Sequence, residues 1–177
     1  DAAEALPISA KEGKGVPEVL EAIIARVPPP SGDPQAPFKA LIFDSWFDNY
    51  QGVIVLARLV DGSIRPGMKI KVMSNNRTFE VMEVGQFTPK RTKKTELLTG
   101  EVGYLCANMR EVADVKIGDT LTDAVEPTSA PFPGYKEVKP LVFCGLYPTD
   151  TGRYEDLRDA LVKLRLNDSS FVYEPET

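Results

Sequence analysis

The chain has no histidine in any of its 177 residues. Without imidazole it can form no Ser-His-Asp triad, no Cys-His pair and no imidazole general base. It has only two cysteines, Cys106 and Cys144, which without histidine cannot complete a usual structural zinc site. Carboxylate pairs near strand ends, for example among Asp44, Asp48 and Asp61, are more typical of solvated turns than of a glycosidase dyad. We therefore expect neither a catalytic site nor a metal site in this chain by itself.

Long apolar runs are also missing. The longest, residues 53–57, is far below the roughly 20 residues that a helix needs to cross a bilayer. The chain does not open with a charged segment followed by an apolar one, as a secretory signal does. Each cysteine lies in a short apolar run, which favours two reduced, buried thiols. We expect a cytoplasmic protein with no transmembrane segment; peripheral attachment at the cytoplasmic face of a bacterial inner membrane stays compatible with this.

Charge is unevenly distributed along the chain. The net charge is −5, yet residues 38–123 hold twelve basic against eleven acidic side chains. Four cations and no acid fall within residues 88–95: Lys90, Arg91, Lys93 and Lys94. Such a cluster produces a local positive field, and phosphate backbones are its natural partners. From charge alone, a solvated surface loop explains the cluster equally well.

The first 37 residues predict one helix and a linker. Apolar side chains recur at helical spacing over residues 16–27. Pro17 suits the first turn, where its missing N–H costs nothing. The three prolines at 28–30 end the helix, and residues 31–37 have the composition of a linker.

Residues 38–123 predict a mainly β domain. Branched and aromatic residues alternate with turn signals every 8–12 residues. We expect about six strands, at residues 38–47, 52–60, 68–73, 78–87, 103–109 and 116–121. A small closed Greek-key barrel is the expected architecture, because closure leaves no exposed sheet edge.

A second proline-rich linker is expected at residues 124–137, and a truncated α/β domain at 138–177. Residues 141–147 are apolar, residues 157–164 have a helical apolar face, and residues 171–173 resemble another strand. Acidic side chains early in that helix and basic ones late agree with the helix dipole. The order corresponds to a partial ferredoxin-like β-α-β segment.

The chain resembles the LepA family of ribosome-binding translational GTPases, also called back-translocating elongation factors. Residues 37–53 (PFKALIFDSWFDNYQGV) are similar to the start of the family's second domain. Residues 139–148 (KPLVFCGLYP), 153–161 and 164–168 resemble its third domain. Residues 8–16, with Ser9, Ala10 and Lys11, resemble the last guanine-contacting loop and closing helix of a G domain. The similarity follows the family's domain order over nearly the whole chain.

This resemblance implies a GTPase acting in elongation, with GTP and Mg²⁺ as cofactors of the longer protein. The chain contains no Gly-x-x-x-x-Gly-Lys-Ser/Thr phosphate loop, so we expect it to hold no cofactor and to be inactive alone. Ser9, Ala10 and Lys11 would be a nucleotide-binding remnant.

The resemblance also implies partners: the ribosome, through small-subunit RNA and proteins, and ribosomal complexes that carry tRNA. The expected RNA contacts are Lys90, Arg91, Lys93 and Lys94. Four further cations could extend the surface: Arg58, Arg65, Lys69 and Lys71. Tyr50 and Trp46 could stack on bases, and we assign neither. Two alternatives stay open: another translational GTPase, of the translocase or BipA type, or a barrel that binds a protein or small ligand.

Overall fold

The computed structural model describes residues 4–111, 114–134, 141–167 and 172–175. Its contacts divide the chain into two compact units, residues 1–30 and 31–177. None of the helices in these described ranges is long and apolar enough to cross a membrane.

The first unit contains helix α1 (Val16–Arg26), as the sequence predicts. Gly15 caps it at φ 72°, and a Cβ there would lie 2.6 Å from the Pro7 carbonyl oxygen. Glycine is therefore the residue that fits this entry to the helix. The apolar side chains of Leu20, Ile23 and Ile24 are exposed within the unit.

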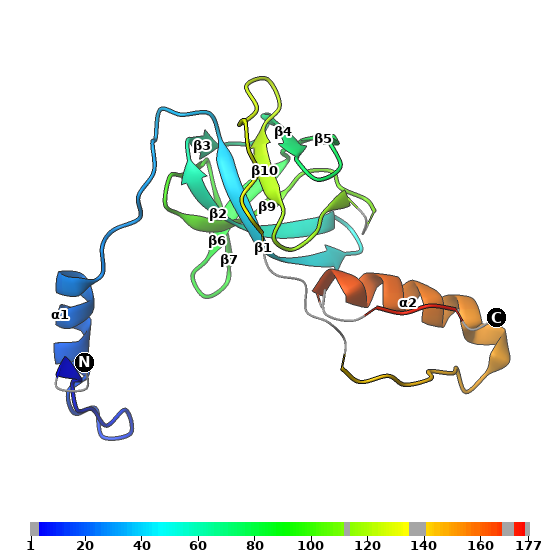
Figure 1. Cartoon of the computed structure of the whole chain (residues 1–177), viewed down its shortest axis with the longest axis horizontal. Coiled ribbons are helices and arrows are strands. Elements are labelled where there is room, and N and C mark those ends of the chain that lie inside the picture. The colour runs from blue at the N-terminus through cyan, green and yellow to red at the C-terminus, as the bar shows by residue number, and fades with distance from the viewer. Residues whose placement is uncertain (1–3, 112–113, 135–140, 168–171, 176–177) are drawn as a thin grey trace. The chain divides into compact units, whose positions relative to one another are not determined.

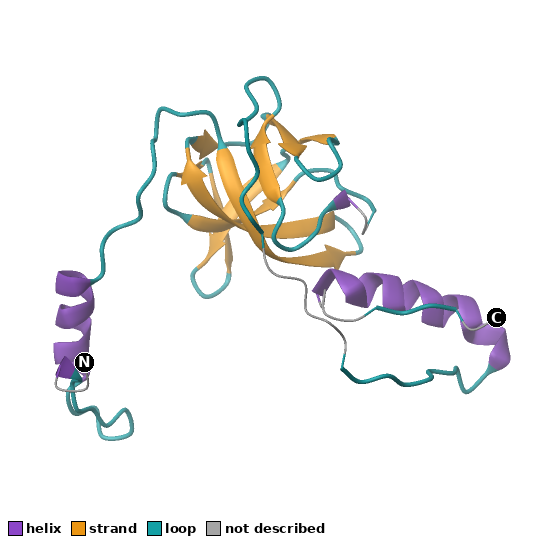
Figure 2. Cartoon of the chain, in the orientation of Figure 1, coloured by secondary structure: helices purple, strands orange, loops and turns teal. Residues whose placement is uncertain are grey.

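The second unit contains ten strands in its described part, all in antiparallel pairs (Figures 1 and 2). They are β1 (Lys39–Asp48), β2 (Gly52–Asp61), β3 (Ser63–Ile64), β4 (Lys69–Val72), β5 (Thr78–Glu80), β6 (Glu83–Phe87), β7 (Arg91–Lys94), β8 (Leu97–Leu98), β9 (Val102–Cys106) and β10 (Thr120–Asp123). Eight form one sheet in the order β5-β4-β10-β1-β2-β9-β6-β7, and β3 pairs with β8. The domain is thus mainly β.

The expected count of about six strands was too low. The single strand expected at residues 78–87 is two: β5 pairs with β4, whereas β6 pairs with β9 and β7. The break falls at Val81, which is buried, and Met82, whose N–H donates to the Cys106 carbonyl at 2.7 Å. The strand expected at 116–121 begins only at Thr120. Because β5 and β7 end the order of hydrogen-bonded strands, the ladders do not close into a ring.

One face of the sheet builds the main core. Val53, Val55 and Ala57 alternate along β2 and are fully buried there, as the two-residue period of a strand requires. Strands from both ends of the order contribute to the same core, with Ile70 on β4 and Val84 on β6. A shared apolar core of this kind is the main stabilising feature of the domain.

A β-bulge changes which face β1 presents. The register with β2 shifts between Ile42 and Asp44, which reverses the alternation of side chains. Ile42 lies in the main core, whereas Trp46 packs beside Ile54 and Tyr104 in a second, smaller cluster. The extra residue of the bulge thus decides where the only tryptophan lies.

The C-terminal segment differs from the expected β-α-β order. Helix α2 (Tyr154–Asn167) follows the 3₁₀ turn η3 (Thr151–Arg153), and Asp150 caps that turn by accepting from the Gly152 N–H at 2.9 Å. No strand forms in described residues 141–149 or 172–175; residues 139, 140 and 171 of the expected strands lie outside the description. A strand needs a hydrogen-bonded neighbour, and Leu141 is instead 90% exposed.

Candidate nucleic-acid interface

The four predicted cations lie on a β-hairpin and not on an irregular loop. Strands β6 and β7 pair with Phe87 opposite Arg91 and Gly85 opposite Lys93. Between the strands, the Thr88 N–H donates to the Lys90 carbonyl at 2.9 Å, and the hydroxyls of Thr88 and Thr92 lie 3.0 Å apart. The backbone that carries the cations is therefore regular and hydrogen-bonded.

Arg91 is bound within the protein and is not a free surface cation. Its Nη2 lies 2.8 Å from Glu83 Oε1, and its Nη1 donates to Gln51 Oε1 at 2.5 Å. Its guanidinium lies 4.3 Å from the centroid of the Tyr104 ring. Nη2 also contacts Cys106 Sγ at 3.1 Å. These contacts use the planar fork and the stacking face that distinguish arginine from lysine.

Glu83 is the centre of this network. Its carboxylate, with the side chain 13% exposed, binds Arg91, Lys93 (2.5 Å) and the Tyr104 hydroxyl (3.0 Å). Burial alone would raise the Glu83 pKa, but hydrogen bonds from Lys93 and Tyr104 and the Arg91 charge outweigh it, and the pKa lies below its ordinary value. The hydrogen bond to Glu83 is the main cause that raises the Lys93 pKa.

The three lysines differ in how much of their charge is available. Lys93 pairs with Glu83 but stays 77% exposed. Lys94 is only one-third exposed and pairs with Glu101 at 2.7 Å, whose carboxylate also accepts from the Leu98 N–H at 2.8 Å. Lys90 is exposed, and no carboxylate of the described residues pairs with it. Lys90 and Lys93 therefore carry most of the accessible positive charge of the hairpin.

The turn between β1 and β2 is joined to this hairpin. Asp48 accepts from the backbone N–H of Tyr50 at 2.8 Å and of Gln51 at 2.9 Å, and these bonds lower the Asp48 pKa. The Gln51 side chain binds Arg91 on β7. Tyr50, in the middle of the turn, is 98% exposed.

The other predicted site residues lie elsewhere. On β4, Lys69 and Lys71 are separated from β7 by five strands in the sheet order, and Figure 1 places β4 and β7 at opposite ends of the β domain. Arg58 lies on β2, opposite Val102. Trp46 is half-buried and contacts Phe87, with their ring centroids 6.0 Å apart.

In the first unit, the predicted remnant forms a small closed turn before α1. The Ser9 N–H donates to the Lys14 carbonyl at 3.0 Å, and Ser9 Oγ accepts from the Glu12 N–H at 3.3 Å. Ala10 and Lys11 are exposed.

The carboxylates considered for catalysis have structural roles. Asp48 caps its turn, Asp44 accepts from the Ser45 N–H at 2.8 Å, and Asp61 accepts from the Asp33 N–H at 3.0 Å. Within residues 4–111, 114–134, 141–167 and 172–175, no cluster of three or more Asp, Glu or Cys is arranged to hold a metal ion.

Analysis of the sequence did not identify the acidic partners of the cations. Glu83, Glu101 and Tyr104 look like ordinary strand residues in sequence, and their roles depend on the pairing of β6 with β9 and β7. A weak signal was present, because Glu83 and Arg91 lie on either side of a turn-forming Thr-Pro-Lys. Reading these segments as a hairpin would have brought the two charges together.

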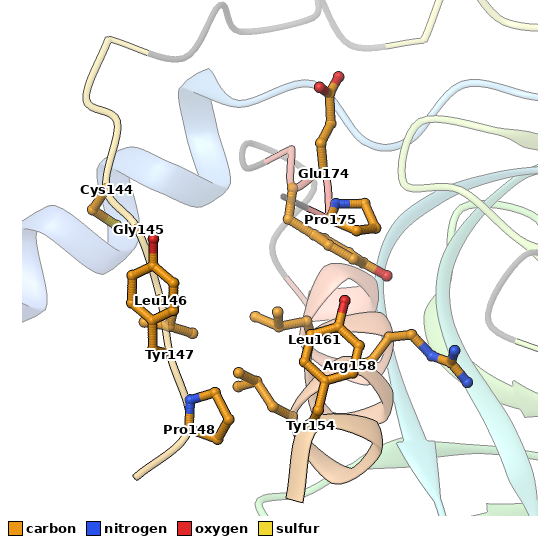
Figure 3. A pocket seen from close by; sticks show the side chains of 12 residues that line it. Cys144, Gly145, Leu146, Tyr147, Pro148, Tyr154, Arg158, Leu161, Glu174 and Pro175 are labelled. Carbon is orange, nitrogen blue, oxygen red and sulfur yellow. The ribbon is translucent and has the colours of Figure 1, made fainter. Parts of the chain in front are cut away.

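The description of both cysteines as buried is wrong for one of them. Cys106 is buried at the hairpin, and Cys144 is exposed. Cys144 lies at the edge of a pocket of about 270 Å³ between residues 144–148, α2 and residues 173–175 (Figure 3). The β strands contribute no residue to the lining of this pocket.

Residues 52–122 match the family model for elongation factor Tu domain 2. Over all 177 residues, the chain is 56% identical to an elongation factor 4 of Sorangium cellulosum and 55% identical to that of Halalkalibacterium halodurans. The chain belongs to the elongation factor 4 family, or LepA. Identity of this size along the whole chain favours this family over the translocase and BipA alternatives.

The matched region covers 100% of this chain but 30% and 29% of these two elongation factor 4 proteins. A crystal structure of sup35 complexed with GMPPNP matches 53% of this chain and 22% of its own, at 26% identity. Its TM-score of 0.47 is too low to support an argument about this elongation factor 4 domain.

Proposed function

We propose that the β domain docks on RNA of the small ribosomal subunit, as part of a GTPase that acts in elongation. The observation that carries the proposal is the β6–β7 hairpin, which presents Lys90 and Lys93 on an internally braced backbone. Cations held in place lose less conformational freedom on binding phosphates than cations on a mobile loop. Membership of an elongation factor family supports the ribosome, including complexes that carry tRNA, as the partner.

The four cations have different roles in this proposal. Lys90 and Lys93 contact phosphates, because their charges are the accessible ones. Arg91 braces the hairpin through Glu83, and Lys94 contributes a weaker field because Glu101 pairs with it. Lys69 and Lys71 fall outside the interface.

The whole protein is proposed to hydrolyse GTP with Mg²⁺. The segment Ser9, Ala10 and Lys11 resembles in sequence a loop that contacts a guanine base. Two of its polar groups are already bonded within the turn, and the turn offers no cradle for phosphates. No step of hydrolysis is therefore assigned to these residues.

Two further features belong to the proposal. One is closure of the β domain into a Greek-key barrel, supported by the single core that β4 and β6 share although they lie far apart in the sheet order. The other is a cytoplasmic location, with peripheral membrane attachment as a secondary possibility, because the proposed partner is the ribosome.

The salt dependence of binding tests the proposal. The chain is titrated with isolated small ribosomal subunits at several salt concentrations, as wild type and as the double variant Lys90→Gln/Lys93→Gln. Each lost phosphate contact should reduce the slope of log K against log salt by roughly 0.7–0.9. Lys69→Gln, the same change on β4, is the matched control and should leave the slope unchanged. An unchanged slope in the double variant would refute the role of the hairpin.

The competing function, a β domain that binds a protein or small ligand, predicts no association with ribosomes. The pocket in Figure 3 does not favour it, because α2 and its flanking segments line that pocket and the β domain does not. Co-sedimentation of the chain with small subunits distinguishes the two functions directly.

A further inference from the structure

We propose that Tyr50 is a stacking platform for an unpaired RNA base, and that Arg91 and Gln51 hold it beside the lysines of the hairpin. This inference rests on the proposed RNA docking and adds a base contact to the phosphate contacts. Tyr50 is 98% exposed, which leaves both faces of its ring open. Aromatic rings placed beside cations are the usual means of binding single-stranded nucleic acid.

The backbone that carries Tyr50 is held in place. The Asp48 carboxylate accepts the N–H groups of Tyr50 and Gln51, and Gly52 follows at φ 76°. A Cβ at Gly52 would lie 2.2 Å from the Met109 carbonyl oxygen, and that carbonyl accepts the Val53 N–H at 2.8 Å. The exposed ring therefore projects from an ordered turn, and ordering it on binding costs little.

A direct side-chain link joins this turn to the cationic hairpin. Arg91 Nη1 donates to Gln51 Oε1, the residue after Tyr50, while Nη2 binds Glu83 at the start of β6. Lys90 directly precedes Arg91 in the chain, so the link ends next to an accessible lysine. Arg91 is a positioning residue in this arrangement, because Gln51 and Glu83 bind its two terminal nitrogens and the Tyr104 ring covers one face of its guanidinium.

The alternative use of Tyr50, an apolar contact to another protein, is less consistent with its surroundings. Lys90 and Lys93 are exposed in the neighbouring hairpin, and cations of this kind are depleted from the centres of protein interfaces. An exposed ring on a turn that is linked to a hairpin with accessible cations is matched in charge to a phosphate backbone with unstacked bases.

Substitutions at Tyr50 separate stacking from other contacts. The chain is titrated with protein-free small-subunit ribosomal RNA as wild type, Tyr50→Phe, Tyr50→Leu and Tyr50→Ala. We expect Tyr50→Phe to bind like wild type, and the Leu and Ala variants to bind about 5- to 150-fold more weakly. The salt slope should stay unchanged in all of them, since no charge is altered. Tyr147→Leu, which removes another exposed ring (71%), is the control and should bind like wild type.

The positioning role has its own readout. Gln51→Ala removes the link and keeps every charge and ring, so we expect weaker binding than wild type, a smaller loss than in Tyr50→Ala, and an unchanged salt slope. Wild-type affinity in Gln51→Ala would overturn the positioning role.

The outcomes distinguish this inference from the docking proposal. If Tyr50→Leu binds like wild type while Lys90→Gln/Lys93→Gln reduces the slope of log K against log salt, stacking is wrong and RNA docking stands. If Tyr50→Phe loses as much affinity as Tyr50→Leu, the hydroxyl makes the contact and stacking is also wrong. If the lysine variant keeps the wild-type slope, the docking proposal itself fails. Because Tyr50 is almost fully exposed, the thermal unfolding of its variants should match wild type, which excludes misfolding as the cause.

Discussion

The guanidinium of Arg91 lies over the ring of Tyr104, whose hydroxyl donates to Glu83, the carboxylate that also binds Arg91. Three strands meet at this point: β6 carries Glu83, β7 carries Arg91 and β9 carries Tyr104. Arg91, one of the four cations of the proposed RNA contact, thus braces the hairpin that presents the other three. Stability and binding can therefore be separated by substituting adjacent residues.

Replacing Arg91 should destabilise the domain, whereas replacing Lys90 should not. Arg91→Met keeps an unbranched apolar side chain but removes the charged hydrogen bond to the mostly buried Glu83 carboxylate. We therefore expect the free energy of unfolding to fall by about 1–3 kcal/mol. Lys90→Met, on the exposed turn, should change it by less than about 0.5 kcal/mol. Urea denaturation measures both. Equal stability of the two variants would show that the Arg91 network does not contribute to folding.

Glu83 should make stability depend on pH in the acid range. Its folded-state pKa lies below the ordinary value, so its stabilising contribution is present above the unfolded-state pKa of about 4.3. The contribution is lost as the pH falls through the lowered folded-state pKa. Denaturation of wild type and Glu83→Gln at pH 7 and at stepwise lower pH measures this: the variant should be less stable at pH 7 and lose less on acidification. Glu96→Gln, at an exposed position, should behave as wild type.

Gly85 should tolerate no side chain. A Cβ there would lie 2.2 Å from the Thr92 carbonyl oxygen and 2.5 Å from the Tyr104 hydroxyl. Gly85→Ala should therefore force β6 away from its neighbours and cost about 1–3 kcal/mol. Gly152→Ala is the matched control, because the nearest atom to its Cβ would be 3.4 Å away. Thermal unfolding compares the two, and a Gly85→Ala variant as stable as the control would contradict the packing.

The two thiols should react at very different rates. Cys106 is 4% exposed, and burial raises its pKa, so little thiolate is available to attack a reagent. Cys144 is exposed. With a chromogenic disulfide reagent, we expect one fast thiol in the native chain and a second only after denaturation. Cys144→Ser should abolish the fast phase; a fast phase that survives would show that Cys106 is accessible.

Patterns within single segments predicted much of the fold. The apolar spacing and flanking prolines predicted α1, and the branched and aromatic residues on either side of a turn predicted β1 and β2. The helical apolar face of residues 157–164 predicted α2. The motif in residues 37–53 placed the chain in its family, which the two elongation factor 4 relatives confirm. The four cations were recognised as a cluster, but what each of them contacts was not.

What could not be predicted depends on contacts between segments distant in the chain. The sequence by itself determined which residues are apolar, charged or turn-forming, because helical and strand periodicity are local properties. The tertiary structure decided that residues 78–87 form two strands, that the bulge moves Trp46 out of the main core, and that Arg91 binds Glu83. Strand pairing sets these outcomes, and pairing is determined by partners far along the chain that no local pattern specifies.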